Sequence, residues 1–122
     1  MKQARIYFVE DDAVLVRVIE WRLKTLGYNV CGFSDNGADA IEKIQELKPD
    51  LVLLDIELSG DMNGIEVGKF LAEKTSIPFI YLTSHSDDDY LVRAKETHPK
   101  GFVRKPFDDD RLRVAVELAI SD

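Results

Sequence analysis

Carboxylates, hydroxyl groups and a lysine follow the short apolar segments of this chain. Glu10, Asp11 and Asp12 follow the first segment, and Asp55 follows the run Leu51–Leu54. Asp and Glu oxygens suit Mg²⁺ and Mn²⁺, and carboxylates crowded together raise one another's pKa unless a cation compensates. We therefore expect Mg²⁺ at these residues, with Mn²⁺ as the alternative. Capping of the following helix is the alternative role for Glu10, Asp11 and Asp12.

Asp55 is the candidate for covalent chemistry. A carboxylate at the exit of a buried apolar segment is costly unless it is paired. Such an Asp can attack a phosphoryl group and form an acyl phosphate when a metal ion and a cationic side chain neutralise the charge on the transferring oxygens. Lys105 is the candidate cation, and the Thr83 hydroxyl is a candidate donor to a phosphoryl oxygen. Taken singly, each is more simply explained as a surface lysine or a strand-end threonine.

Strands and helices alternate in the predicted secondary structure. Apolar runs predict five buried strands, at Arg5–Val9, Asn29–Phe33, Leu51–Leu54, Phe79–Leu82 and Gly101–Val103. Apolar residues with helical spacing follow each run, over Val14–Leu23, Ala38–Leu47, Ile65–Leu71, Tyr90–Ala94 and Leu112–Ala119. This alternation predicts one α/β domain over residues 1–122, a doubly wound five-stranded parallel sheet with helices on both faces. The polar residues that follow the strands would then meet at the carboxyl edge of the sheet, where such folds bind ligands.

Composition narrows the classes of function. The chain has 122 residues, 45% hydrophobic and 32% charged, which is material for one globular domain. Its 16 basic and 23 acidic residues give a net charge of -7, which disfavours direct binding to nucleic acid. No apolar run is long enough to span a bilayer, and the N-terminal residues lack a signal-peptide pattern. Because Cys31 is the single cysteine, we expect a cytoplasmic protein without membrane association.

The order and spacing of these motifs resemble the receiver domains of two-component response regulators, whose best-known stand-alone member is the chemotaxis response regulator. The resemblance covers nearly the whole chain. It rests on Val9–Asp12, Leu54–Ile56, Met62–Glu66, Leu82–Ser84 and Gly101–Phe107. It implies a flavodoxin-like (βα)5 fold and a phosphorylation-gated signalling function.

The resemblance also implies a role for each site residue. Asp55 would accept a phosphoryl group from a histidine kinase or a phosphotransfer protein. Asp11, Asp55 and the backbone carbonyl of Glu57 would bind Mg²⁺ directly, and Glu10 would act through a water molecule. Lys105 would pair with the phosphoryl group. The domain would catalyse its own phosphotransfer and autodephosphorylation without being a conventional enzyme.

Two switch residues and two residues that tune hydrolysis follow from the same resemblance. Thr83 would move toward the phosphoryl group and Phe102 would change rotamer with it, altering a surface that controls a partner or an output domain. Glu57 and His85 would influence how fast the acyl phosphate hydrolyses. The Lys105–Pro106 peptide bond is expected to be cis. From the residues alone, Phe102 is more simply a core aromatic and His85 an exposed loop residue.

Mixed charges mark the surface expected to respond, which comprises the fourth helix, the fifth strand and the fifth helix. They are Asp87–Asp89, Arg93, Lys95, Arg104, Asp108–Asp110, Arg111 and Arg113. Pairing of these charges across a homodimer is one interpretation, and a plain solvated face is the other, slightly favoured one.

Three other functions stay open at this point. The first is a receiver-like scaffold that acts without phosphorylation. The second is a Mg²⁺-dependent aspartyl-phosphate phosphatase similar to the haloacid dehalogenases, although Asp55–Ser59 only half matches their Asp-x-Asp-x-Thr signature. The third is a flavodoxin-type cofactor binder, in which Glu10–Asp12 would repel the cofactor's phosphate.

Overall fold

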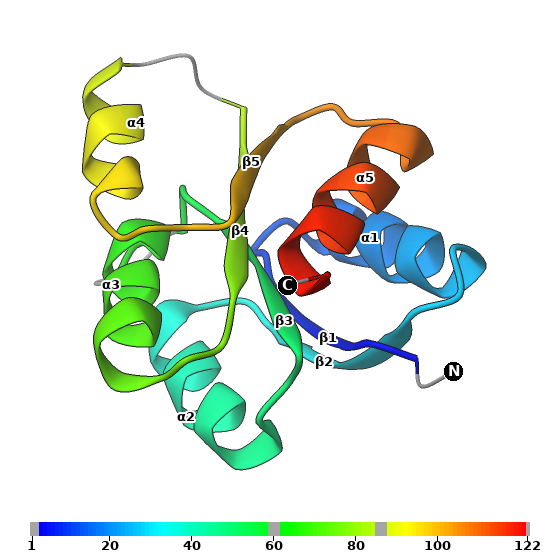
Figure 1. Cartoon of the computed structure of the whole chain (residues 1–122), viewed down its shortest axis with the longest axis horizontal. Helices are drawn as coiled ribbons and strands as arrows, with labels where there is room; N and C mark the ends of the chain where they lie inside the picture. Colours follow the sequence, from blue (N-terminus) through cyan, green and yellow to red (C-terminus); the bar gives the residue numbers. More distant parts are fainter. Residues whose placement is uncertain (1–2, 59–61, 85–87, 122) are drawn as a thin grey trace.

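The computed structural model describes residues 3–58, 62–84 and 88–121, and strands and helices alternate through them (Figure 1). The strands are β1 (Arg5–Val9), β2 (Asn29–Ser34), β3 (Leu51–Asp55), β4 (Phe79–Thr83) and β5 (Gly101–Arg104). The helices are α1 (Ala13–Thr25), α2 (Gly37–Leu47), α3 (Gly64–Lys74), α4 (Asp88–Lys95) and α5 (Asp109–Ile120). The predicted alternation is confirmed.

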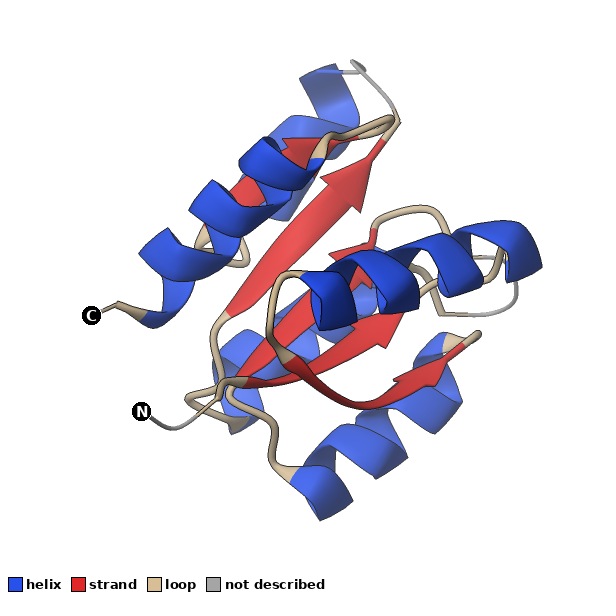
Figure 2. Ribbon diagram, turned by 90° about the vertical axis from the view of Figure 1, so that its right-hand side faces the viewer, coloured by secondary structure: helices blue, strands red, loops and turns tan. Residues whose placement is uncertain are grey.

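The strands form one parallel sheet in the order β2-β1-β3-β4-β5. Helices α1 and α5 cover one face, and α2, α3 and α4 cover the other, so that the sheet lies between two helical layers (Figures 1 and 2). This is the predicted doubly wound, flavodoxin-like architecture. Its carboxyl edge gathers the ends of β1, β3 and β4, which are neighbours in the sheet.

The central strands supply both halves of the core. In β1, Ile6 and Phe8 pack with α1 and α5, whereas Tyr7 and Val9 pack with α2 and α3. All residues of β3 and β4 are buried. A strand covered on both faces has no solvent side, which is why these segments are continuous apolar runs rather than alternating ones.

The outer strands depart from the prediction of five buried strands. β2 and β5 form the two edges of the sheet, and each is covered less completely than the strands between them. Phe33 of β2 is 47% exposed, and Arg104 of β5 is exposed. The strand order causes this difference, because an edge strand has a neighbour on one side only.

Four strands also extend one residue beyond the predicted ends. Their last residues are Ser34, Asp55, Thr83 and Arg104, all of them polar. The ladder continues through them: Asp55 pairs with Leu82, and Thr83 with Arg104. Two candidate site residues, Asp55 and Thr83, are therefore fixed by backbone pairing within the sheet instead of lying in the loops that follow it.

Tight connections hold the helix starts against the strand ends. Asp12 caps α1 by accepting hydrogen bonds from the backbone N–H groups of Val14 and Leu15. At the start of α3, a Cβ on Gly64 would lie 2.0 Å from the carbonyl oxygen of Asp55. Only glycine therefore allows α3 to begin this close to the end of β3.

Candidate functional site

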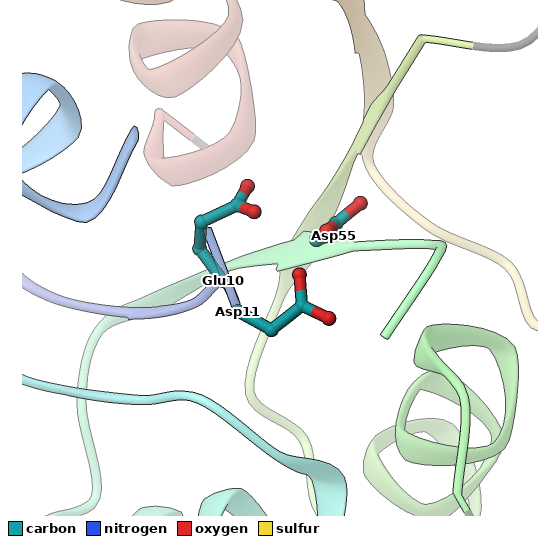
Figure 3. Close-up of side chains that lie close together, drawn as sticks. All are labelled: Glu10, Asp11 and Asp55. Atoms are coloured by element: carbon teal, nitrogen blue, oxygen red, sulfur yellow. The ribbon is translucent and has the colours of Figure 1, made fainter. Parts of the chain in front are cut away.

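Three carboxylates meet at the carboxyl edge of the sheet. Val9, the last residue of β1, pairs with Leu54 of β3, so that Glu10, directly after β1, and Asp55, the last residue of β3, hold equivalent positions on neighbouring strands. Glu10, Asp11 and Asp55 each offer an oxygen atom, and these atoms lie within 4.8 Å of one another (Figure 3). Glu10 is 1% exposed and Asp55 is 3% exposed, while Asp11 is exposed to solvent. The arrangement is a compact set of oxygen ligands, open on the Asp11 side.

Asp12 has a different role from the two acidic residues before it. Its carboxylate caps α1, as the capping interpretation predicts. Its backbone N–H donates to Oε2 of Glu10 at 3.1 Å, which orients the buried Glu10 carboxylate. The capping interpretation therefore holds for Asp12, whereas Glu10 and Asp11 belong to the acidic cluster with Asp55.

Lys105 brings a positive charge into this cluster from the end of β5. Its Nζ donates to Oε1 of Glu10 at 2.8 Å and lies 3.3 Å from Oδ1 of Asp55. Its backbone N–H donates to the carbonyl oxygen of Thr83 at 2.7 Å. The Lys105–Pro106 peptide bond is cis, as predicted.

Burial dominates the electrostatics of Asp55. Loss of solvent raises its pKa from 3.8 to about 6, with the Glu10 charge acting in the same direction, although Lys105 and the Glu57 N–H favour the ionised form. For Lys105, burial lowers the pKa, but the Glu10 hydrogen bond and the Asp55 charge outweigh it, and the pKa is raised. One lysine does not compensate the buried acidic groups, so the cluster favours a further cation.

The donor atoms of the cluster fit a hard divalent cation. All three side chains offer carboxylate oxygens, which suit Mg²⁺ and Mn²⁺ better than the softer metals that favour thiolate or imidazole. The exposure of Asp11 leaves one side of the cluster accessible to water. Mg²⁺ usually keeps several waters when it binds to proteins, which agrees with this geometry.

Thr83 and Glu57 flank the acidic cluster. Thr83 ends β4 and is 4% exposed. The backbone N–H of Glu57 donates to Oδ1 of Asp55 at 3.1 Å, and its side-chain Oε1 accepts a hydrogen bond from Ser84 Oγ at 3.0 Å. Ser84 has no assigned role in the sequence-based set of site residues. Its hydroxyl, directly after a strand that ends at the same edge, is the signal that could have identified it.

An open cleft of about 480 Å³ surrounds these groups. Its lining is mainly acidic and comprises Glu10, Asp11, Asp12, Leu15, Asp55, Glu57, Ser84, Lys105 and Pro106. Asp55 can therefore be reached by a small molecule or by a side chain of another protein, but only past other carboxylates.

Among the described site residues of the prediction, Thr83 and Phe102 are not in the lining of this cleft. Phe102 lies on β5, where its half-buried ring stacks on Tyr81 with a centroid distance of 5.6 Å and an interplanar angle of 29°. His85 lies outside the described residues. Since Tyr81 is two residues before Thr83 on β4, Phe102 contacts the strand that ends in the candidate switch hydroxyl.

The predicted mixed-charge surface is partly paired within the chain. Asp109 lies 2.5 Å from Arg22 of α1, and Asp110 lies 3.2 Å from Arg113. Asp108 caps α5 by accepting from the backbone N–H of Arg111. Asp87 lies outside the described residues. These contacts give several charges an internal role, in line with the solvated-face interpretation.

The fold and the cleft define a class of protein: a doubly wound parallel α/β domain with an open acidic cleft at the carboxyl edge of its sheet, whose carboxylates suit a divalent cation. The model of the response regulator receiver domain matches residues 6–117, and the chain belongs to this family. Receiver domains serve phosphorylation-dependent signalling in two-component systems. Within the described residues, no helix is both long and apolar enough to cross a membrane.

Similar proteins include transcription regulators and isolated receiver domains. The chain is 32% identical over 117 residues to the transcriptional regulatory protein PdtaR of Mycobacterium tuberculosis, covering 96% of this chain and 57% of PdtaR. It is 36% identical over 120 residues to the DNA-binding response regulator MtrA of Mycobacterium leprae, covering 97% of this chain and 52% of MtrA. The chain thus spans about half the length of the curated relatives it matches.

A solved receiver domain shares the fold closely. The signal receiver domain of a modulated diguanylate cyclase from Desulfovibrio desulfuricans superposes with a TM-score of 0.93 at 35% identity, covering 98% of this chain and 95% of that domain. The similarity therefore extends over the whole sheet and both helical layers.

Proposed function

We propose that this chain is a phosphorylation-gated switch whose phosphoryl acceptor is Asp55. The supporting observation is the buried Asp55 carboxylate, 3% exposed, which lies 3.3 Å from Lys105 Nζ and within one cluster with Glu10 and Asp11. A buried group of carboxylates does not stabilise a fold, because its members repel one another and lose solvent. A reaction at Asp55 explains why they are together.

The proposed donor is a phosphohistidine of a histidine kinase or a phosphotransfer protein. A carboxylate oxygen of Asp55 forms a bond to phosphorus while the bond to the donor's imidazole nitrogen breaks, and that nitrogen keeps the electron pair. Lys105 offsets the charge on the transferring oxygens. Water later cleaves the acyl phosphate, which restores the Asp55 carboxylate and releases inorganic phosphate.

Mg²⁺ fits this proposal as the partner of the acidic cluster. Asp11, Asp55 and the Glu57 backbone carbonyl would hold it directly, and Glu10 through water. When bound, the ion supplies positive charge that offsets the acidic groups and the incoming phosphoryl oxygens. Lys105 alone gives one positive charge against Glu10 and Asp55, its two neighbours in the cluster.

Helix α1, which contributes one residue to the cleft, also exposes apolar side chains. Leu15, in the first turns of α1, lines the cleft, and the same helix exposes Val14 and Trp21, which are 72% and 65% exposed. Exposed large apolar side chains near a reactive group favour contact with another protein. This supports a protein, rather than only a metabolite, as the phosphoryl donor.

The output surface would be α4, β5 and α5. Phosphorylation adds roughly -1.5 to -2 charge and strong acceptor oxygens. In our proposal, Thr83 and Lys105 donate hydrogen bonds to these oxygens in only one arrangement of the connection after β4. Moving a two-state domain from 1:99 to 99:1 takes about 5.5 kcal/mol. A hollow of about 610 Å³ between β5 and α5 is lined by Phe102 and by the exposed Val114 and Leu118, which suits an output domain or a second copy of this chain.

Intact mass spectrometry tests the acceptor directly. The protein is incubated with acetyl phosphate, with Mg²⁺ or with EDTA, and Asp55→Asn is treated in parallel. We expect a gain of one phosphoryl group in the native chain with Mg²⁺, and no gain in Asp55→Asn or in EDTA. No gain from acetyl phosphate or from a panel of purified histidine kinases would overturn the proposal and favour the phosphorylation-independent scaffold. Rapid turnover of phosphomonoesters would favour the phosphatase.

A further inference from the structure

The lysine of the acidic cleft lies on a short connection between β5 and α5, which spans residues 105–108. Lys105 is the first residue of this connection, and its Nζ lies 2.8 Å from Oε1 of Glu10 and 3.3 Å from Oδ1 of Asp55. Its backbone N–H donates to the carbonyl oxygen of Thr83, which fixes this end of the connection to β4. The place of the lysine also depends on how the other end is held.

Arg22 of α1 holds the other end of this connection. Its guanidinium carbon lies 5.8 Å from the centroid of the Phe107 ring. Its Nη1 lies 2.5 Å from Oδ1 of Asp109, the first residue of α5. Phe107 is 8% exposed and belongs to the core between the sheet and helices α1 and α5, which cover the same face (Figure 1). One side chain therefore contacts both the buried ring of the connection and the start of the next helix.

The two contacts of Arg22 support each other. The ion pair with Asp109 is partly exposed to solvent, which weakens it on its own. A guanidinium over an aromatic ring adds cation–π attraction, and its planar group stacks on the ring while its edge donates to a carboxylate. Movement of Phe107 away from Arg22 would also expose apolar surface. A side chain of α1 thus restrains the connection that carries Lys105, two residues before Phe107.

We propose that Arg22 is a positioning residue for the phosphorylation of Asp55 and acts through Lys105. By holding Phe107 and the start of α5, it keeps the Lys105 ammonium where that group meets the transferring oxygens. The inference rests on Asp55 being the phosphoryl acceptor. In the reaction with acetyl phosphate, Asp55 forms a bond to phosphorus while the bond from phosphorus to the acetyl oxygen breaks, and acetate leaves with the electron pair.

Three variants remove different parts of this contact. Arg22→Ala removes both the ion pair and the cation over the ring. Arg22→Lys keeps a charge that can pair with Asp109 but lacks the planar group over Phe107. Asp109→Asn removes the ion pair and leaves Arg22 over the ring. Arg17→Ala is the matched control, because it makes the same change of net charge as Arg22→Ala at an exposed position of the same helix.

Initial rates of phosphorylation are measured by intact mass with acetyl phosphate and saturating Mg²⁺, with each variant made in the native chain and in Lys105→Ala. In the native background, we expect Arg22→Ala to react about five- to tenfold more slowly, because a displaced charged group loses part of its effect on the transition state. Arg22→Lys and Asp109→Asn should each be about two- to threefold slower. Arg17→Ala should react like the native chain. In Lys105→Ala, which lacks the group that Arg22 positions, Arg22→Ala should change the rate by less than about 1.5-fold.

Urea unfolding of the same proteins separates positioning from a general loss of structure. Arg22→Ala should lower the urea midpoint equally in the native chain and in Lys105→Ala, whereas it should lower the rate only where Lys105 is present. A substitution that merely loosened the fold would slow the reaction alike in both backgrounds. The dependence of the rate on Lys105 is therefore the measurement that a purely structural role of Arg22 would not reproduce.

Failure of the proposed function and failure of this inference give different results. If neither acetyl phosphate nor purified histidine kinases modify the native chain, the acceptor function fails, and this inference fails with it. If the native chain is modified and folded Arg22→Ala reacts at the native rate, only the inference is overturned. Equal slowing by Arg22→Ala with and without Lys105 would overturn it as well. If Arg22→Ala does not fold, Arg22→Lys and Asp109→Asn decide the question by the same comparison of two backgrounds.

Discussion

The two ends of the sheet differ in how they accommodate polar and charged side chains. At the amino end, polar groups pair near the surface: Asp50 accepts from the Arg5 backbone N–H at 2.8 Å, and Tyr28 donates to Glu117 at 2.5 Å. At the carboxyl end, Glu10 and Asp55 are almost fully buried. The amino end thus satisfies its polar groups at low cost, while the carboxyl end buries charges that destabilise the fold.

Cavity size does not separate these two ends. The hollow at the amino end, bordered by Tyr28, Asp50 and Glu117, measures about 730 Å³ and exceeds the acidic cleft of about 480 Å³. What separates them is chemistry, because only the smaller cleft contains the buried carboxylate with a raised pKa, Asp55, beside a lysine. A perturbed ionisable group in a cleft marks a functional site better than volume does.

The largest effect should come from removing the cation of the acidic cleft. Lys105→Ala takes away the group that lies within 3.3 Å of Asp55 and that meets the transferring oxygens in our proposal. We expect the rate of phosphorylation by acetyl phosphate to fall about a hundredfold, the usual effect of losing one preorganised donor. Lys43→Ala, which removes an exposed lysine of α2, should react like the native chain. An unchanged rate in folded Lys105→Ala would show that this end of the sheet does not need its lysine.

The second prediction concerns stability and pH. The pKa of Asp55 is about 6 in the folded protein against 3.8 for the free group, so the folded state favours its protonated form. Protonated Asp55 therefore adds to the free energy of unfolding. This stabilisation is fully present below pH 3.8 and is lost as pH rises through about 6. At pH 7 without divalent cations, Asp55→Asn should be more stable to urea than the native chain by about 2 to 3 kcal/mol.

The advantage of Asp55→Asn should shrink as the pH falls toward 4, because the native carboxylate then becomes protonated. Asp50→Asn provides the contrast at the other end of the sheet. Its carboxylate accepts a hydrogen bond from Arg5, so the change should lower stability by about 1 kcal/mol or less. A stabilising Asp50→Asn, or a destabilising Asp55→Asn at pH 7, would contradict the distinction between the two ends.

The sequence predicts the site better than the details of its geometry. Parallel strands bring their carboxyl ends to one edge, so Glu10, Asp55, Thr83 and Lys105 could be grouped from order and spacing alone. The amino-acid sequence could not show that Asp55 and Thr83 belong to the strands. By periodicity alone, polar residues at strand ends are indistinguishable from loop residues. Backbone pairing with the neighbouring strand decides that point.

Long-range geometry accounts for the other differences. Glu10, Asp11 and Asp12 have similar side chains, yet Asp12 alone among them caps α1, because helix direction fixes which carboxylate faces the free N–H groups. The edge position of β2 depends on strand order, which no local pattern encodes. The Glu57–Ser84 contact joins residues 27 positions apart and depends on the shapes of two loops.

The third prediction concerns the cation itself. A ligand that binds only the folded state stabilises it by RT ln(1 + [L]/Kd), which is about 1.4 kcal/mol at ten times Kd. Mg²⁺ should therefore raise the urea midpoint of the native chain, and Asp11→Asn should remove most of that gain because it loses an oxygen ligand of the cluster. Urea unfolding over a Mg²⁺ series, with NaCl of equal ionic strength as the control, measures the effect. If Mg²⁺ raised the urea midpoint equally in the native chain and in Asp11→Asn, the cation would bind at another site.

The smallest effect is expected at the amino end of the sheet. Burial raises the pKa of Tyr28, and its hydroxyl donates to the exposed Glu117, so Tyr28→Phe removes one surface hydrogen bond and leaves no buried group unpaired. The free energy of unfolding should fall by roughly 0.5 to 1 kcal/mol, and the rate of phosphorylation by acetyl phosphate should not change. Urea unfolding and the intact-mass assay measure both quantities on the same sample. A change of more than about twofold in that rate, which is larger than 0.4 kcal/mol in barrier height, would show that the amino end communicates with Asp55. The two ends would then form one functional unit, in place of a structural end and a reactive one.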